Sequence, residues 1–198
     1  MKLIVGLGNP GRAYERTRHN AGFVAAEAAA AAWGWPWTGT MRSGGRDVAR
    51  YAQGAIGAGT VRLVEPLTFM NLSGTAVGPY VRRQAIAPSD VLGVCDEVQL
   101  PPGRLRLRAG GTAGGHHGLE SMIAALGTQE FPRLRIGVGR QPLPADLAGF
   151  VLARMAPPEW AQLLAALPRV VAACESWVRQ DVVAAMNHCN REVKESSA

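Results

Sequence analysis

Blocks of apolar residues alternate along the chain with glycine-rich and charged segments, and their spacing predicts strands followed by helices. Continuous, partly β-branched apolar runs at Lys2–Leu7 and Asp90–Asp96 are typical of buried strands. Two further strands are expected near Asp47–Gln53 and Thr60–Val64, and another at "RLRIGVG". Apolar residues at helical spacing predict helices at Ala21–Trp33, Ser73–Arg83 and Pro157–Arg179.

Two stretches rich in turn-forming residues interrupt this pattern. Gly34–Gly45 combines Gly, Pro, Ser and Thr and predicts a loop, and the flexible segment Gly110–Gly118 leads into a helix at "LESMIAAL". Asn20 is placed to cap the helix that begins at Ala21. In Arg104–Arg108 arginine alternates with leucine, so on a strand these arginines share one face.

Strands that alternate with helices predict an α/β fold. We expect a single domain over residues 1–190, in which helices flank both faces of a twisted, mixed and mostly parallel sheet. Residues 191–198 are expected to form a frayed tail. A chain of 198 residues is long enough for one sizeable core.

The amino-acid composition also indicates what kind of partner the protein binds and in which cellular compartment it works. The formal charge is +6, and every basic residue except Lys2 and Lys194 is arginine, which suits bidentate contacts with phosphate. A nucleic acid is therefore the expected partner, although a biased genomic base composition would also enrich arginine. Three widely spaced cysteines without a CxxC argue against a disulfide framework and a zinc knuckle. No secretory signal or membrane span is recognisable, which favours the cytoplasm.

The segment Gly6–Gly11 matches the G-x-G-x-x-G fingerprint of dinucleotide-binding folds. Its context disagrees with that interpretation, because Pro10 and the polar run after it delay the helix that should begin inside the fingerprint. The acidic residue at the expected distance, Glu27, falls within the alanine-rich helix and not at a strand end. A nucleotide-cofactor enzyme therefore stays as a minor alternative.

Four polar residues follow strand ends and together suggest hydrolysis. His19 is suited to take a proton near neutral pH, and a carboxylate such as Asp96 can orient an imidazole and stabilise its charged form. The amides of Asn9 and Asn71 can donate to an oxygen that gains negative charge. Without a G-x-S-x-G elbow or a placed cysteine nucleophile, water is the simplest attacking group. Each residue alone could equally be a cap or a turn residue.

Other motifs predict binding more than chemistry. The adjacent residues His116 and His117 cannot share one helical face, so no metal site is expected. Arginines on the Arg104–Arg108 strand, together with Arg133 and Arg135, could hold a nucleic-acid backbone or merely solvate a sheet edge. For the tryptophans, packing under a loop is favoured over base stacking, at Trp33, Trp35 and Trp37.

Five motifs in order resemble the bacterial peptidyl-tRNA hydrolase family: "IVGLGNPGRAYERTRHNAGF", "PLTFMNLSG", "DEVQLPPG", "GGHHGLESM" and "RLRIGVGR". The resemblance extends from Lys2 to about Val151. It implies an enzyme that cleaves the ester between a peptide, or an N-blocked amino acid, and the 3′ end of tRNA. It also implies a monomer without metal or cofactor whose partner is peptidyl-tRNA, bound through its 3′ CCA end and acceptor stem.

The resemblance also implies residue roles. His19 matches the base that activates water, Asp96 its orienting acid, and Asn9 the amide that separates blocked from free aminoacyl-tRNA. The matching substrate and tRNA contacts are Tyr14, Phe69, Asn71 and His117.

One departure from the family pattern stands at His117, where the family usually has asparagine ("GGHNG"). A histidine lacks the amide's geometry and can become charged. We therefore keep a catalytically impaired RNA-binding protein of the same fold as the main alternative. For the enzyme, we expect the His19 ring and the Asp96 carboxylate to lie near hydrogen-bond distance, about 3 Å.

Overall fold

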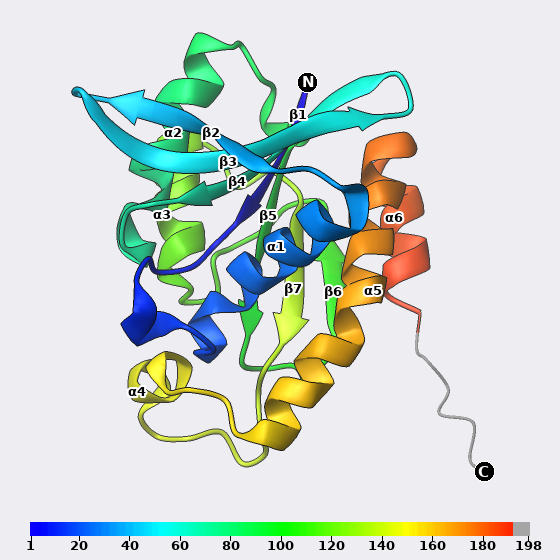
Figure 1. Cartoon of the computed structure of the whole chain (residues 1–198). Coiled ribbons are helices and arrows are strands. Elements are labelled where there is room, and N and C mark those ends of the chain that lie inside the picture. Colours follow the sequence, from blue (N-terminus) through cyan, green and yellow to red (C-terminus); the bar gives the residue numbers. More distant parts are fainter. Residues whose placement is uncertain (192–198) are drawn as a thin grey trace.

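The computed structural model describes residues 1–191 and contains a seven-stranded mixed sheet with the order β2-β3-β4-β1-β5-β7-β6 (Figure 1). The central strands β4, β1, β5 and β7 are parallel, and antiparallel pairs close both edges. The expected fold class is therefore confirmed. The strands span β1 Lys2–Gly6, β2 Trp37–Ser43, β3 Arg46–Ile56, β4 Gly59–Pro66, β5 Val91–Glu97, β6 Leu105–Arg108 and β7 Arg133–Gly137.

Helices cover both faces of this sheet (Figure 1). On one face α2 and α3 pack together, and on the other α1 packs against α5, which in turn contacts α6. The helices span α1 Ala21–Trp33, α2 Ser73–Arg83, α3 His117–Leu126, α4 Leu147–Leu152, α5 Pro157–Arg179 and α6 Val182–Cys189. The expected frayed tail lies outside the described residues apart from position 191. No helix in the described part of the chain is both long and apolar enough to cross a membrane.

Period-two alternation on β1 explains why the sheet needs a helical layer on each side. Leu3 and Val5 belong to the core under α2 and α3, whereas Ile4 between them belongs to the core under α1 and α5. All three side chains are at most 1% exposed. A strand that is apolar on both faces is stable only where both faces are covered.

The close approach of α1 to the sheet depends on Gly22. A Cβ at this position would collide with the carbonyl oxygen of Val94 on β5 and with the backbone of Leu7 after β1. The first turn of α1 therefore lies directly over the ends of two neighbouring strands. Residues that immediately precede α1 are thereby held at the carboxyl edge of the sheet.

The prediction of a loop over Gly34–Gly45 is wrong, because this segment contains β2. Trp37, Gly39 and Met41 alternate with exposed residues, and Met41 is 3% exposed. The ring of Tyr51 on the neighbouring strand occupies the space over Gly39. The glycine that weakened the strand signal is therefore the residue that makes room for an aromatic ring.

Several other predictions differ from the structure in the length or number of elements. Strand β3 is longer than the predicted Asp47–Gln53, and α4 and α6 were not expected. The prediction that Asn20 caps α1 is wrong, since its side chain makes no capping hydrogen bond. The tryptophans pack against the core as expected, since Trp33, Trp35 and Trp37 are each partly buried against it. The expected loop over them is wrong for two of the three, because Trp33 lies on α1 and Trp37 on β2.

The predicted basic surfaces are only partly correct. On β6 the side chains of Arg106 and Arg108 are exposed while the leucines between them are buried, as the alternation predicts. Arg133, by contrast, is 1% exposed and donates to backbone carbonyls, among them those of Thr112 and Gln129. Arg133 therefore ties loops to the sheet and is not available for a nucleic acid.

Strand β4 buries the carboxyl group of Glu65. Glu65 is fully buried and accepts a 2.6 Å hydrogen bond from Nε of Arg50, while its Oε1 has no partner among the described residues. Burial raises the pKa of Glu65 from 4.5 to about 7, although the charge and hydrogen bond of Arg50 oppose the shift. The fold thus disfavours the ionised form of this side chain.

A pH-dependent stability follows from Glu65. Because its folded pKa lies above the unfolded value, its contribution is fully present below pH 4.5 and is lost as the pH rises through about 7. Relative to Glu65→Gln, the protein should lose on the order of 3 kcal/mol of unfolding free energy over this window. Urea unfolding at several pH values measures the difference. Glu27→Gln, which removes an exposed partner of the same Arg50 but keeps Glu65, is the control, and its pH curve should stay close to that of the unmodified chain. Parallel pH curves for Glu65→Gln and the unmodified chain would contradict the assignment.

Candidate functional site

A cleft of about 590 Å³ opens at the carboxyl edge of the central parallel strands. In open α/β sheets this edge is where binding sites are usually found, because the loops after several strands converge there. All the candidate site residues from the sequence line the cleft: Asn9, Tyr14, His19, Phe69, Asn71, Asp96 and His117. The topology therefore gathers into one cavity residues that lie up to about a hundred positions apart.

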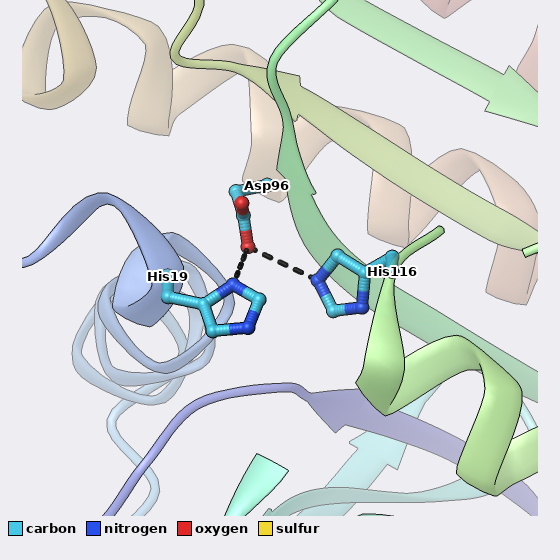
Figure 2. A group of neighbouring side chains, drawn as sticks. All are labelled: His19, Asp96 and His116. Carbon is cyan, nitrogen blue, oxygen red and sulfur yellow. Dashed lines mark hydrogen bonds and ion pairs between the residues drawn. The ribbon is translucent and has the colours of Figure 1, made fainter. Parts of the chain in front are cut away.

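His19 and Asp96 are in direct contact at the base of this cleft (Figure 2). His19 lies in the 3-10 turn η2, Arg18–Asn20, just before α1, and Asp96 lies near the end of β5. The distance from Nδ1 of His19 to Oδ1 of Asp96 is 2.9 Å, as expected for a hydrogen bond. The two residues are only 8% and 3% exposed. Because Nδ1 donates to the carboxylate, Nε2 is the nitrogen that can accept a proton.

His116 is a third member of this group, which the sequence analysis did not place there. Its Nε2 lies 3.0 Å from the same Oδ1 of Asp96 (Figure 2). Its Nδ1 accepts from the backbone N–H groups of Gly118 and Leu119 at the start of α3. An imidazole nitrogen that accepts carries no proton, so these bonds place the proton on Nε2, which donates to Asp96. The signal in the sequence was its position directly before a helix, where side chains cap N–H groups.

The electrostatics of the group favour an ionised Asp96. Burial by itself would raise the pKa of this carboxyl group, but His116 and His19, through charge and hydrogen bonds, bring the pKa well below its usual range. A buried carboxylate that accepts from two rings fixes both of them in orientation and tautomer. Any positive charge that develops on His19 is then compensated at once.

Hydrogen bonds also fix the position of Asn9, which lines the same cleft. Its backbone exchanges two hydrogen bonds with the side chain of Asn20, at 2.8 and 2.9 Å. This contact is why Asn20 does not cap α1. The Oδ1 atom of Asn9 accepts from the backbone N–H of Met70 at 2.8 Å. Since Oδ1 must be the acceptor there, the Nδ2 group of Asn9 is the one left to donate to a ligand.

The remaining candidate residues lie nearer the opening. The rings of Tyr14 and Phe69 meet edge to face with centroids 6.2 Å apart, and Phe69 is 56% exposed. Asn71 is exposed on the following turn, η3, Met70–Leu72. His117 is exposed at the first position of α3 and pairs with Glu120 at 3.0 Å. Aromatic and polar side chains thus both line the exposed part of the cleft.

Two further elements complete the walls. Arg135 on β7 lines the cleft and forms an ion pair with Glu97, so the arginine is anchored beside the cavity. Four residues of α4 add an apolar wall, with Leu147 and Leu152 40% and 45% exposed. The sequence analysis missed this wall because α4 is too short to produce a helical pattern.

The buried group could in principle bind a metal, since the ligand atoms of His19, Asp96 and His116 lie within 4.8 Å of one another. A cation would have to displace the protons that both rings direct at Asp96. The existing hydrogen bonds already satisfy the geometry of the three groups. The arrangement is suited to acid–base chemistry: a base with a free Nε2, an ionised partner and an amide donor that lines the same cavity.

Comparisons with known proteins identify the family. The sequence model of the peptidyl-tRNA hydrolase family matches residues 3–197. The chain is 47% identical to a peptidyl-tRNA hydrolase of Symbiobacterium thermophilum, over 96% of this chain and 98% of the relative. It is 42% identical to one from Mycobacterium bovis, over 93% and 95%. The crystal structure of the peptidyl-tRNA hydrolase of Acinetobacter baumannii superposes with a TM-score of 0.86 at 36% identity, covering 96% of this chain and 94% of that one.

These matches include nearly the whole chain, and they involve both sequence and three-dimensional structure. The chain belongs to the peptidyl-tRNA hydrolase family.

Proposed function

We propose that this chain hydrolyses the ester bond between a peptide, or an N-blocked amino acid, and tRNA, and so releases free tRNA for translation. The observation that carries the proposal is the 2.9 Å hydrogen bond between His19 and Asp96, in a cleft that also holds the other candidate residues. Membership of the family supports the substrate class. A substrate that arises from translation places the enzyme in the cytoplasm, and we expect it to act as a monomer.

The reaction needs only water and side chains of the cleft. Nε2 of His19 takes a proton from a water molecule, whose oxygen attacks the carbonyl carbon of the ester. The ionised Asp96 stabilises the resulting imidazolium. Nδ2 of Asn9 is placed to donate to the oxyanion of the tetrahedral intermediate. When the intermediate collapses, the ribose oxygen leaves with the proton from His19, and both products are free.

Binding of the tRNA end is assigned to the opening of the cleft. The exposed ring of Phe69, with Tyr14 beside it, offers a stacking surface for an unpaired base of the CCA end. Asn71 and His117 can form hydrogen bonds with the same segment. Exposed arginines of β6 are candidates for the phosphates of the acceptor stem.

The test of this proposal is turnover of an N-acetylated aminoacyl-tRNA. His19→Ala should lower kcat by about 10²- to 10⁴-fold, the usual contribution of a general base. His188→Ala, which changes an exposed histidine on α6, is the matched control and should keep full activity. Tight binding of the tRNA by the unmodified chain without turnover would instead identify an inactive RNA-binding protein. A tightly bound nucleotide cofactor would favour the dinucleotide-binding alternative.

His116 offers a test of the buried group, because two substitutions separate its contacts. His116→Ala removes both the bond to Asp96 and the cap of α3, whereas Asn at this position can still cap the helix but is too short to reach Asp96. Both variants should lose kcat to a similar extent, about 10-fold or more. Only the alanine variant should lose a further ~1 kcal/mol of unfolding free energy. Full kcat in His116→Asn would show that the residue serves only as a cap.

His117 is the place where this chain departs from the family pattern. An exposed imidazole beside Glu120 can become charged as the pH falls, which an amide cannot do. If His117 contacts the tRNA end, His117→Asn should flatten the activity profile on the acidic side of neutral pH, because an amide carries no charge. Steady-state rates across this range measure the effect, with His188→Asn as the control. An unchanged profile would exclude a substrate contact that depends on this charge.

A further inference from the structure

Arg18 directly precedes His19 but points away from the cleft, into the protein. The residue is 7% exposed, which is rare for an arginine unless it is paired, and its Nε has no hydrogen-bond partner among the described residues. Its guanidinium stacks on the ring of Phe150 with 4.0 Å between the guanidinium carbon and the ring centroid. It lines neither the catalytic cleft nor the second cavity of the described residues. Direct contact with substrate therefore does not explain it.

The hydrogen bonds of Arg18 go to the end of α4. Nη1 donates to the carbonyl oxygen of Phe150 at 3.1 Å and to that of Ala153 at 3.4 Å. The carbonyl oxygen of Phe150 also accepts from the backbone N–H of Ala153 at 3.3 Å, and the negative end of the helix dipole makes a cation at this end favourable. The backbone N–H of Arg18 also donates to Ala153. Arg18 thus binds the end of α4 through both its side chain and its backbone.

The other half of the guanidinium reaches α5. Nη2 lies 2.6 and 2.7 Å from the two carboxylate oxygens of Glu159. Glu159 also accepts from the backbone N–H of Ala156 at 2.7 Å, which caps the start of α5. Arg18 and Glu159 therefore join three segments: the turn that carries His19, the end of α4 and the start of α5.

Such a connection matters because α4 cannot be stable by itself. Isolated helices of fewer than about 12 residues are marginal in water, and α4 has six. Yet Leu147, Val151 and Leu152 of α4 form the apolar wall of the cleft. The position of this wall then depends on contacts on the opposite side of the helix, where Phe150 is buried against Arg18.

We propose that Arg18 and Glu159 form a clamp that sets the position of α4 as a wall of the catalytic cleft, which makes Arg18 a positioning residue for substrate binding. The inference rests on the proposed function of the cleft. Loss of the clamp releases α4 but leaves the bonds of Asp96 to His19 and His116 in place. The effect is therefore expected in KM, with little change in kcat or in its pH dependence.

The experiment compares Arg18→Gln, Arg18→Lys and Glu159→Gln with the unmodified chain on the N-acetylated aminoacyl-tRNA. Arg154→Gln is the matched control, because it removes the same charge from an exposed arginine between α4 and α5. Arg18→Gln should raise KM about tenfold or more relative to that control. Arg18→Lys, which retains the charge but has only one nitrogen to serve both the α4 carbonyl oxygens and Glu159, should give an intermediate KM. Hydrogen exchange should become faster at the α4 amides in Arg18→Gln and not in the control.

Different outcomes separate this inference from the proposed function. If the unmodified chain turns over the substrate and His19→Ala does not, but Arg18→Gln matches Arg154→Gln in KM and in α4 exchange, the clamp is refuted. A fall in kcat with unchanged α4 exchange would also refute it, since Arg18 would then act on His19. Glu159 is partly exposed, so Glu159→Gln keeps a folded reference if Arg18→Gln is unstable. That variant should show the same KM shift to a smaller extent.

Discussion

The buried carboxylate of Asp96 is the centre on which this structure depends. Two imidazoles donate to one of its oxygens, at 2.9 and 3.0 Å, and the residue is 3% exposed. An ionised group at this depth is costly unless it is paired. Its partners come from separate loops, before α1 and before α3. The same hydrogen bonds therefore satisfy a buried charge and set the direction in which His19 presents Nε2 to the cleft.

The sheet explains how residues distant in sequence reach this centre. Parallel strands β1, β4 and β5 all end at one edge. Asn9 and Asn71 follow the ends of β1 and β4, and Asp96 lies at the end of the neighbouring β5. Gly22 allows α1 to lie against the strand ends, and this brings His19 over the sheet. The glycines and proline after β1 form the turn that presents Asn9, whose backbone Asn20 holds. The first segment of the chain thus supplies both Asn9 and His19 to the site.

Sequence patterns predicted the fold class, most strands and three long helices, and together with the family resemblance they named seven of the residues that line the cleft. They failed where the pattern of an element was weak, or where the same residue type fits both a buried and an exposed position. Glycine at position 39 hid β2 because its role is to accommodate the Tyr51 ring. Six residues are too few to show the periodicity of α4. His116 and Arg133 could not be placed because charged and polar side chains do not reveal from sequence whether they are buried and paired.

The central claim is that His19 is a neutral base whose Nδ1 donates to Asp96 and whose Nε2 is free to take a proton. Nitrogen-15 chemical shifts of the His19 ring, measured at mildly alkaline pH, test it directly. The account predicts a protonated Nδ1 and an unprotonated Nε2, with the Nδ1 signal moving when Asp96 is replaced by Asn. A ring protonated at Nε2, or one insensitive to Asp96→Asn, would contradict the account.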